Sequence, residues 1–185
     1  MGSVIPLKKE INNSYLELKN LVGSKLGSVN QHIKYKLASE INLIHKMTSH
    51  HLNSGGKRIR PLLTLASAKL CGYKNGSRDI NLAACVELIH NATLLHDDVI
   101  DKSDIRRGIK TANSLWGNQS SILVGDYLFS RCFEMMVEDG SQEILKLLSS
   151  TSSRIAQGEV LQLEYKGEID LLEEIYFNII NMKTA

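Results

Sequence analysis

The chain has 185 residues, a length that predicts a single domain. Hydrophobic residues make up 43% and charged residues 23% of it, a globular composition that excludes an intrinsically disordered chain. The 22 Lys and Arg against 20 Asp and Glu leave a net charge of +2, which does not predict binding to nucleic acid or to a membrane surface. No uncharged apolar stretch approaches the roughly 18–20 residues that span a bilayer, and the N-terminus lacks the apolar core of a signal peptide. We therefore expect a cytoplasmic protein without a transmembrane segment.

Three widely spaced cysteines, Cys71, Cys85 and Cys132, argue against both a disulfide framework and a zinc site, because no Cys-x-x-Cys or Cys/His ligand spacing occurs. Each lies in an apolar context. We predict three small buried thiols.

Apolar residues at helical spacing predict a chain of helices. Two stripes cover 11–22 and 37–48. A third helix is expected to open at Pro61, a favoured first-turn residue, and to close near Cys71-Gly72. Further helices are predicted at about 79–101, 120–138 and 142–165, and from Asp170 onward. No segment alternates with period two for long enough to be a convincing strand, so the predicted fold class is all-α.

Three carboxylates crowd the end of the helix predicted at 79–101. Asp97, Asp98 and Asp101 are three and four residues apart, so they lie near one another on a helix, where like charges repel. A solvated acidic helix end is the simpler interpretation. A divalent cation such as Mg²⁺, which takes one or two carboxylates and completes its shell with water and phosphate oxygens, explains why the acids follow an apolar stretch.

Two groups of cations accompany these acids. Arg106 and Arg107 follow after a short loop, and guanidinium groups form bidentate bonds with phosphate, although such a pair alone is usually surface charge. In the segment 55–61 (GGKRIRP), two glycines and three cations precede a helix start, where free N–H groups attract anions. The segment is not a Walker loop, because Arg58 stands where Ser or Thr is needed. The arrangement predicts two phosphorylated substrates.

Five motifs resemble the trans-polyprenyl diphosphate synthases, nearest to the octaprenyl or long-chain group. They are GGKRIRP, LLHDDVID with DIRRG, VGDYLFSRCFEMM, IAQGEVLQLE and KTA, in family order from about Gly55 to Ala185. The resemblance implies a helical bundle of the isoprenoid synthase type and a Mg²⁺-dependent prenyltransferase. The implied substrates are isopentenyl diphosphate and an allylic prenyl diphosphate, and the implied product is a long-chain polyprenyl diphosphate of the octaprenyl type. The resemblance also implies a homodimer.

The resemblance also implies roles for single residues. Asp97 and Asp101, supported by Asp98, would hold the Mg²⁺ that bridges the allylic diphosphate, which Arg106 would contact and Lys183 would neutralise. The residues implied for isopentenyl diphosphate are Lys57, Arg60, His90 and Arg107. Glu159, Gln162 and Thr184 match positions of the substrate cavity and of the Lys-Thr motif. Taken alone, His90 would be interpreted as a core histidine. Because the other motif residues match the family, we favour the binding role.

Product length should depend on side-chain volume beneath the acids. Ala92 and Thr93 are small where short-chain members of the family carry bulky aromatics, which favours a long product. The stripe of Phe129, Phe133 and Met136 is either a tunnel floor or plain core.

Five other residues are predicted to have structural roles or none at the site. Gly125 and Asp126 are interpreted as helix-packing and polar-network positions, and His96 as structural. His50 and His51 belong to no convincing constellation.

The chain departs from the family in one respect. No second aspartate-rich motif follows, since Asp97-Asp98 is the only consecutive Asp pair. We therefore expect residues 1–185 to be the N-terminal portion of one synthase domain, inactive alone. Two alternatives are a non-catalytic subunit of a heteromeric synthase and an all-α terpene cyclase. The intact acids and cations argue against the former, and GGKRIRP, which implies a second diphosphate substrate, argues against the latter.

Overall fold

Eight helices and one short hairpin make up the part of the chain that the computed structural model describes, residues 7–184. Residues 1–6, in which no signal-peptide core is predicted, and Ala185 lie outside this description, as do the side chains of residues 7–13, Ile11 among them. The contacts divide the chain into two units, Met1–Asp139 and Gly140–Ala185. The first unit contains α1 (Leu7–Lys36), α2 (Asn42–Asn53), α3 (Ile59–Leu70), α4 (Arg78–Ile100), β1 (Ile105–Arg106), β2 (Ile109–Lys110), α5 (Ala112–Trp116) and α6 (Asn118–Asp139). The second contains α7 (Gln142–Glu164) and α8 (Glu173–Lys183).

The all-α prediction is confirmed, and α3, α4, α6, α7 and α8 begin and end close to their predicted positions. The short α5 was not predicted, and α1 extends well beyond the stripe predicted at 11–22. The prediction of a helix over 37–48 is wrong at its start. Leu37 is buried at the end of the apolar face of α1, and the chain is extended at Ile41 (φ −80°, ψ 107°) before α2 begins. Apolar spacing continues across this break because both helices turn their apolar faces to one core.

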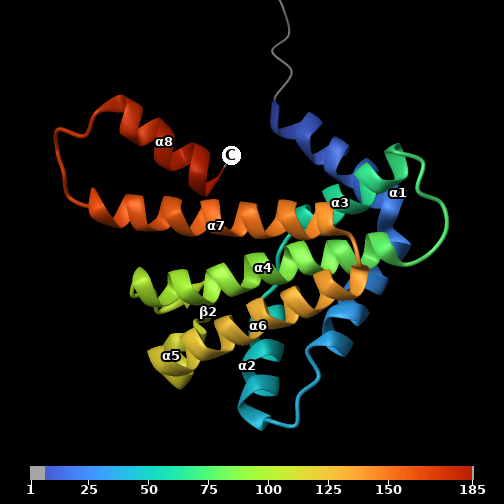
Figure 1. Cartoon of the computed structure of the whole chain (residues 1–185), viewed down its shortest axis with the longest axis horizontal. Coiled ribbons are helices and arrows are strands. Elements are labelled where there is room, and N and C mark those ends of the chain that lie inside the picture. The colour runs from blue at the N-terminus through green and yellow to red at the C-terminus, as the bar shows by residue number, and fades with distance from the viewer. Residues whose placement is uncertain (1–6, 185) are drawn as a thin grey trace, which may run out of the picture. The chain divides into compact units, whose positions relative to one another are not determined.

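The first unit is built around α4. This helix contacts α1, α3, α5 and α6, and Figure 1 shows α4 and α6 side by side. Its buried residues occur around most of its circumference, as is typical of a central helix. Small side chains at Ala83, Ala84 and Ala92, all 0% exposed, let the neighbouring helices approach closely.

The packing of α4 against α6 explains two residues of the VGDYLFSRCFEMM motif. A side chain at Gly125 would clash with the His96 ring, so the predicted packing role of this glycine is confirmed. His96 Nε2 lies 3.2 Å from the carbonyl oxygen of Ile122 and 3.4 Å from Asp126 Oδ1, and its ring stacks on Phe129. The structural interpretation of His96 and Asp126 is therefore supported by their contacts.

The cysteine prediction is correct for two thiols and wrong for the third. Cys85 and Cys132 are fully buried in the first unit. Burial raises the pKa of Cys85 to about 12 and raises that of Cys132 further, so both thiols stay protonated. Cys71 is exposed, because it caps the C-terminal end of α3 and the chain turns away through Gly72 (φ 81°).

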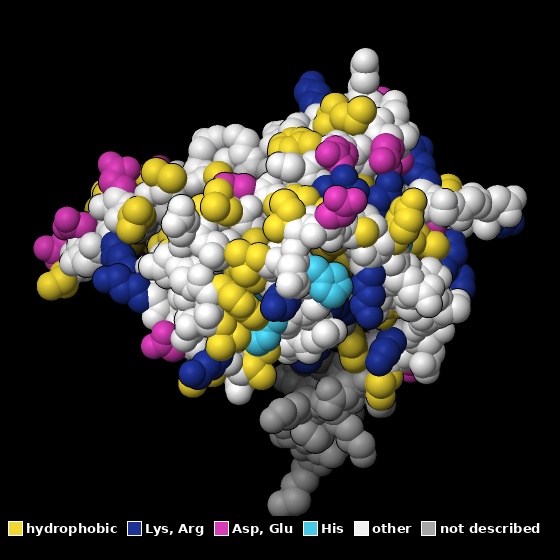
Figure 2. Space-filling model, turned by 90° about the horizontal axis from the view of Figure 1, so that it is seen from below, with side chains coloured by type: hydrophobic (Ala, Val, Ile, Leu, Met, Phe, Trp, Pro, Cys, Tyr) yellow, Lys and Arg dark blue, Asp and Glu magenta, His cyan; other side chains and the backbone are white. Residues whose placement is uncertain are grey.

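Apolar side chains also reach the surface. On the face that Figure 2 shows, they lie between lysines, arginines and acidic side chains. Across residues 7–184, we find no helix with the length and apolarity that crossing a membrane requires.

The second unit is a helical hairpin whose close approach depends on one glycine. Ser141 caps α7 by accepting a hydrogen bond from the backbone N–H of Ile144 (3.3 Å). A Cβ atom at Gly158 of α7 would lie 2.8 Å from the backbone nitrogen of Lys183 and 3.0 Å from Met182 Cβ. Such distances force a shift of the α8 backbone, so α7 and α8 pack as observed only with glycine here.

We predict opposite effects for two helical glycines. Gly158→Ala should destabilise the α7–α8 hairpin by about 1–3 kcal/mol through overpacking. Gly27→Ala, in α1 where nothing lies within 4 Å of the added methyl, should stabilise by about 0.5–1 kcal/mol. Amide hydrogen exchange of each helix measures both changes. Unchanged protection of α7 and α8 in the Gly158 variant would contradict the packing argument.

Candidate functional site

The three acids at the C-terminal end of α4 do not share one environment. Asp97 is half-buried and Asp101 is exposed, and their spacing puts them on one face of the helix. Asp98 points elsewhere. It is 1% exposed, and its Oδ1 accepts a hydrogen bond from Arg106 Nε at 2.7 Å. Among the described residues, no group of three or more His, Cys, Asp and Glu side chains is arranged to hold a metal ion. The structure thus separates Asp98, which is buried against Arg106, from Asp97 and Asp101.

Arg106 and Arg107 lie on a hairpin that the sequence did not predict. In it β1 and β2 pair antiparallel, with Arg106 opposite Ile109. Between them, Arg107 (φ 53°) and Gly108 (φ 81°) both have positive φ, as a two-residue type I′ turn requires. Two residues per strand are too few for period-two alternation to show.

Hydrogen bonds fix this hairpin to the end of α4. The backbone N–H of Ser103 donates to the carbonyl oxygen of Asp98 (2.9 Å), and Asn113 Nδ2 donates to the same oxygen (3.3 Å). Thr111 Oγ1 donates to the carbonyl oxygen of Ser103 (2.7 Å). With the Asp98–Arg106 ion pair, these bonds hold the two arginines beside the helix that carries the acids.

Four of the predicted binding residues surround one pocket. Lys57, Arg60, His90 and Arg107 line a cavity of about 290 Å³, together with Gly56, Arg58, Ile59 and Glu87. They come from the loop before α3, the first turn of α3, the middle of α4 and the hairpin turn. The structure therefore brings together residues that lie up to 50 positions apart in the sequence.

The glycine pair of the GGKRIRP segment is required by Arg107. The Arg107 guanidinium donates to the carbonyl oxygen of Gly55, and a Cβ atom at Gly56 would lie 2.6 Å from Arg107 Nη1. Gly55 and Gly56 also have φ values of 80° and 147°, which side chains rarely adopt. Tyr15 Oη of α1 donates to the carbonyl oxygen of Lys57 (3.0 Å), which holds the loop from its other side.

Arg58 and Glu87 form a buried ion pair that holds this loop, so Arg58, one of the three cations of the GGKRIRP segment, has a partner within the protein. Arg58 has a left-handed backbone (φ 50°), its guanidinium pairs with the Glu87 carboxylate, and its Nη2 donates to the carbonyl oxygen of Leu52 at 2.9 Å. Glu87 is 5% exposed on α4. The sequence does contain a signal for Glu87, which is a carboxylate within the apolar run LAACVELIH. Because acids are almost never fully buried unless paired, its position indicates a buried ion pair.

The cations make this end of the unit electrostatically positive. Burial first, and then the charges of Arg60, Arg107, Arg106 and Arg58, lower the pKa of His90 to about 4. Burial, followed by Arg106 and Arg107, lowers the pKa of His51 to about 4 as well. Both imidazoles are neutral at pH 7. The proximity of His51 to the two arginines arises from tertiary packing, and its sequence neighbourhood carries no signal of it.

The predicted residues of the second unit form a cluster of their own. Lys183 Nζ donates to Gln162 Oε1 (2.8 Å) and forms an ion pair with Glu159 (2.8 Å). Thr184 is exposed at the end of α8. Lys183 of α8 is thus held by two residues of α7.

The predicted chain-length residues differ in exposure. Ala92 is fully buried on α4, and Thr93 is half-buried, with its Oγ1 donating to the carbonyl oxygen of His90 (2.8 Å). On α6, Met136 is buried and Phe133 is 45% exposed. Met136 therefore belongs to the core of the first unit, whereas Phe133 does not.

Comparisons with known proteins agree with the motifs. The sequence profile of the family described as polyprenyl synthetase matches residues 41–185. Octaprenyl diphosphate synthase of Escherichia coli K12 is 43% identical over 169 residues, which cover 91% of this chain and 52% of the relative. The chain spans about half the length of the curated relatives it matches.

Solved structures show the same fold. A decaprenyl diphosphate synthase from Rhodobacter capsulatus superposes with a TM-score of 0.87 at 45% identity, over 91% of this chain and 52% of that one. A polyprenyl synthase from Caulobacter crescentus CB15, complexed with calcium and isoprenyl diphosphate, gives a TM-score of 0.88 at 43% identity, over 91% and 51% of the two chains.

The lowered pKa of His51 predicts an acid-sensitive first unit. Between the ordinary pKa of 6.5 and the folded value of about 4, the unfolded chain binds more protons, so the free energy of unfolding decreases as pH falls through this range. His51 should contribute up to about 3 kcal/mol of this loss. Urea titrations followed by the fluorescence of Trp116, the sole tryptophan, measure it. His51→Gln should flatten the pH dependence, whereas His45→Gln, at an exposed position of α2, should leave it as in the parent.

Proposed function

Because this chain belongs to the polyprenyl synthetase family, we propose that it carries the isopentenyl diphosphate site and the first metal site of a prenyltransferase that makes long polyprenyl diphosphates. The observation that supports this proposal most strongly is the pocket in which Lys57, Arg60, His90 and Arg107 meet. It opens on the same helix, α4, that carries Asp97 seven residues beyond His90, or about 10 Å along the helix axis.

The basic pocket is suited to isopentenyl diphosphate. Lys57, Arg60 and Arg107 provide three cations, and guanidinium groups match phosphate oxygens in bidentate geometry. His90 is neutral before the ligand arrives, and its imidazole can donate one hydrogen bond without adding charge. The Arg58–Glu87 pair offsets the charge of Arg58 and fixes the loop that presents Lys57.

The acidic face of α4 is suited to a divalent cation. Asp97 and Asp101 supply two carboxylates, and Mg²⁺ takes one or two from a protein and the rest of its shell from water and phosphate. When bound, the ion would stabilise negative charge on the allylic diphosphate. The ion pair with Asp98 fixes the orientation of Arg106, and Arg106 would contact the same diphosphate.

Proposals for the second unit rest on the family. Lys183 would neutralise the allylic diphosphate, and Gln162 and Thr184 would line the substrate cavity. Glu159 and Gln162 already hold the Lys183 ammonium, which keeps its charge in place before substrate binds.

These residues suit a reaction in which the C–O bond of the allylic diphosphate breaks and its electron pair leaves with the diphosphate. Cations that face the leaving group stabilise the charge that develops on it. The π electrons of isopentenyl diphosphate form the new carbon–carbon bond, and loss of one proton restores a double bond. Each cycle lengthens the chain by one isoprene unit.

A long product suits the small side chains at Ala92 and Thr93, and we propose octaprenyl diphosphate by similarity to the Escherichia coli relative. The Phe133 side chain is proposed to limit chain length.

A homodimer in the cytoplasm is proposed for the protein. A non-catalytic subunit is not favoured, because the acids and cations of both sites are intact.

Magnesium-dependent binding tests the acidic site. The chain should bind geranyl diphosphate in the presence of Mg²⁺ by isothermal titration calorimetry. Asp97→Ala with Asp101→Ala should abolish the Mg²⁺-dependent part of the binding, because each substitution removes a metal ligand. Asp104→Ala, at an exposed acid of the loop after α4, should not.

Asp98→Asn should instead lower the free energy of unfolding by about 3 kcal/mol, because it breaks a buried ion pair.

Isopentenyl diphosphate provides the internal control for the calorimetric experiment. Its binding should survive in the Asp97/Asp101 variant and be lost with Lys57→Ala and Arg60→Ala. Unchanged Mg²⁺-dependent affinity for geranyl diphosphate without both acids would rule out the proposed metal site.

Turnover tests the remaining proposal. We expect the 185-residue chain to bind both substrates without elongating them, because Asp97-Asp98 is its only consecutive Asp pair and the family uses a second aspartate-rich motif. A prenyl-transfer assay with labelled isopentenyl diphosphate, geranyl diphosphate and Mg²⁺ measures this. Sustained formation of long products would show that one acidic motif suffices.

A further inference from the structure

A second cavity lies in the first unit, away from the basic pocket. It has a volume of about 410 Å³ and is lined by α1, the C-terminal half of α3, the turn that follows it and the first turn of α4. Its volume lies near the lower end of the roughly 300–1,000 Å³ typical of small-molecule sites. No role described above uses it. We call it the lysine pocket, after Lys25, Lys69 and Lys74, which line it.

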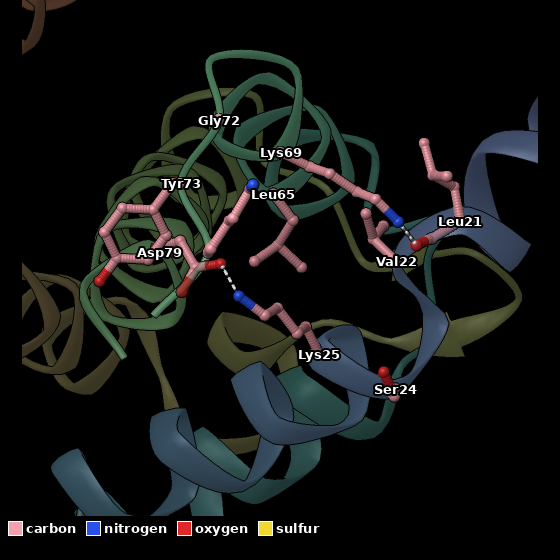
Figure 3. Close-up of a pocket in the computed structure, with 10 residues that line it drawn as sticks. Leu21, Val22, Ser24, Lys25, Leu65, Lys69, Gly72, Tyr73 and Asp79 are labelled. Carbon is pink, nitrogen blue, oxygen red and sulfur yellow. Dashed lines mark hydrogen bonds and ion pairs between the residues drawn. The ribbon is translucent and has the colours of Figure 1, made fainter. Parts of the chain in front are cut away.

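One side of the lysine pocket is apolar. Leu21, Val22 and Leu65 line it, and Leu65 is 1% and Val22 5% exposed. In the view of Figure 3, the Leu65 and Val22 side chains lie in the space between Lys25 and Lys69. A short aliphatic group placed here would cover Leu21, which is 51% exposed, and would remove apolar surface from water.

The polar side carries an excess of positive charge. Lys25 Nζ is paired with the buried Asp79 carboxylate at 2.5 Å, so these two charges offset one another. Lys69 Nζ donates to the carbonyl oxygen of Leu21 (3.2 Å), which occupies one of its three protons. Among residues 14–184, whose side chains the structure describes, Lys74 has no partner for a hydrogen bond or ion pair. Lys69 and Lys74 can therefore both bind an anion.

The lysine pocket and the basic pocket share no lining residue. Both lie along α3 and α4, but Asp79 and His90 are eleven residues apart on α4, or about 16 Å. A ligand small enough to fit in one pocket therefore cannot reach the cations of the other. The two pockets are thus separate sites, at opposite ends of α3.

We propose that the lysine pocket binds a small anionic amphiphile, a phosphate or diphosphate ester with a short aliphatic tail. The head group would contact Lys69 and Lys74, and the tail would pack on Val22 and Leu65. Charge and apolar surface are adjacent in this cavity, so neither a free anion nor a neutral hydrocarbon satisfies both. The proposal does not depend on prenyl transfer at the basic pocket.

Cys71 provides a local measurement. It is the exposed one of the three cysteines, and it precedes Gly72, which lines the lysine pocket. n-Octyl phosphate should slow alkylation of Cys71 by iodoacetamide in a saturable manner, and isothermal titration calorimetry should give the same affinity. Inorganic phosphate and octanol, which carry only the head or only the tail, should protect at least about tenfold less well.

Matched variants locate the binding. Lys69→Ala with Lys74→Ala should weaken n-octyl phosphate binding about tenfold or more, because two charge-assisted contacts are lost. Lys46→Ala, at an exposed lysine of α2, should leave it unchanged, as should Lys57→Ala with Arg60→Ala in the basic pocket. Ser24→Phe, at an exposed lining position, should block binding by filling the cavity without removing charge.

Three results would overturn the proposal. They are absence of saturable protection in the parent chain, equal affinity in the Lys69/Lys74 variant with an unchanged circular dichroism spectrum, and equal protection by octanol. Vesicles of phosphatidylglycerol distinguish the source of the anion. Protection by vesicles alone would assign the face to a lipid surface and contradict a soluble ester as the ligand.

Discussion

Three buried carboxylates on α4 impose the constraint from which the arrangement of the first unit follows. Asp79, Glu87 and Asp98 are each 5% exposed or less, and a buried carboxylate without a partner is strongly destabilising. Each is paired with a cation from a different element: Lys25 of α1, Arg58 before α3 and Arg106 of the hairpin. The pairs thereby fix the position of these three elements along one helix. Apolar packing brings the same elements together, but the ion pairs specify which residue meets which.

The candidate site depends on two of these pairs. With Arg58 and Arg106 held by Glu87 and Asp98, their neighbours Lys57 and Arg107 are directed to the basic pocket. Left-handed backbone at Arg58 and Arg107 accompanies this division, since adjacent cations must point in different directions. Burial first, and then the charges of the nearby arginines, lower the pKa of His90 and His51 and keep both imidazoles neutral. A site that is positive in advance attracts a diphosphate without protonation of a histidine.

Sequence periodicity located most of the long helices, because their apolar residues recur at helical spacing. It failed where two elements share one face, as at Leu37 to Ile41, and where an element is too short for periodicity, as in the hairpin around Arg107. Among the site residues, the motifs singled out Lys57, Arg60, His90 and Arg107, which the structure gathers around one pocket. They did not single out Arg58, Glu87 or His51, whose importance comes from partners distant in the chain. Cys71 was misjudged because an apolar neighbourhood in sequence does not decide which side of a helix end faces solvent.

Family membership, the all-α class and the chemical character of both charged segments were readable from residue order, because each depends on local spacing along the chain. The separation of Asp98 from Asp97 and Asp101 was not, since three neighbouring acids look equivalent until packing buries one of them against Arg106. The lysine pocket likewise had no local signature, because α1, α3 and α4 each contribute only part of it. Tertiary structure decided both, as burial and pairing of charges are properties of surfaces that meet only after the chain has folded.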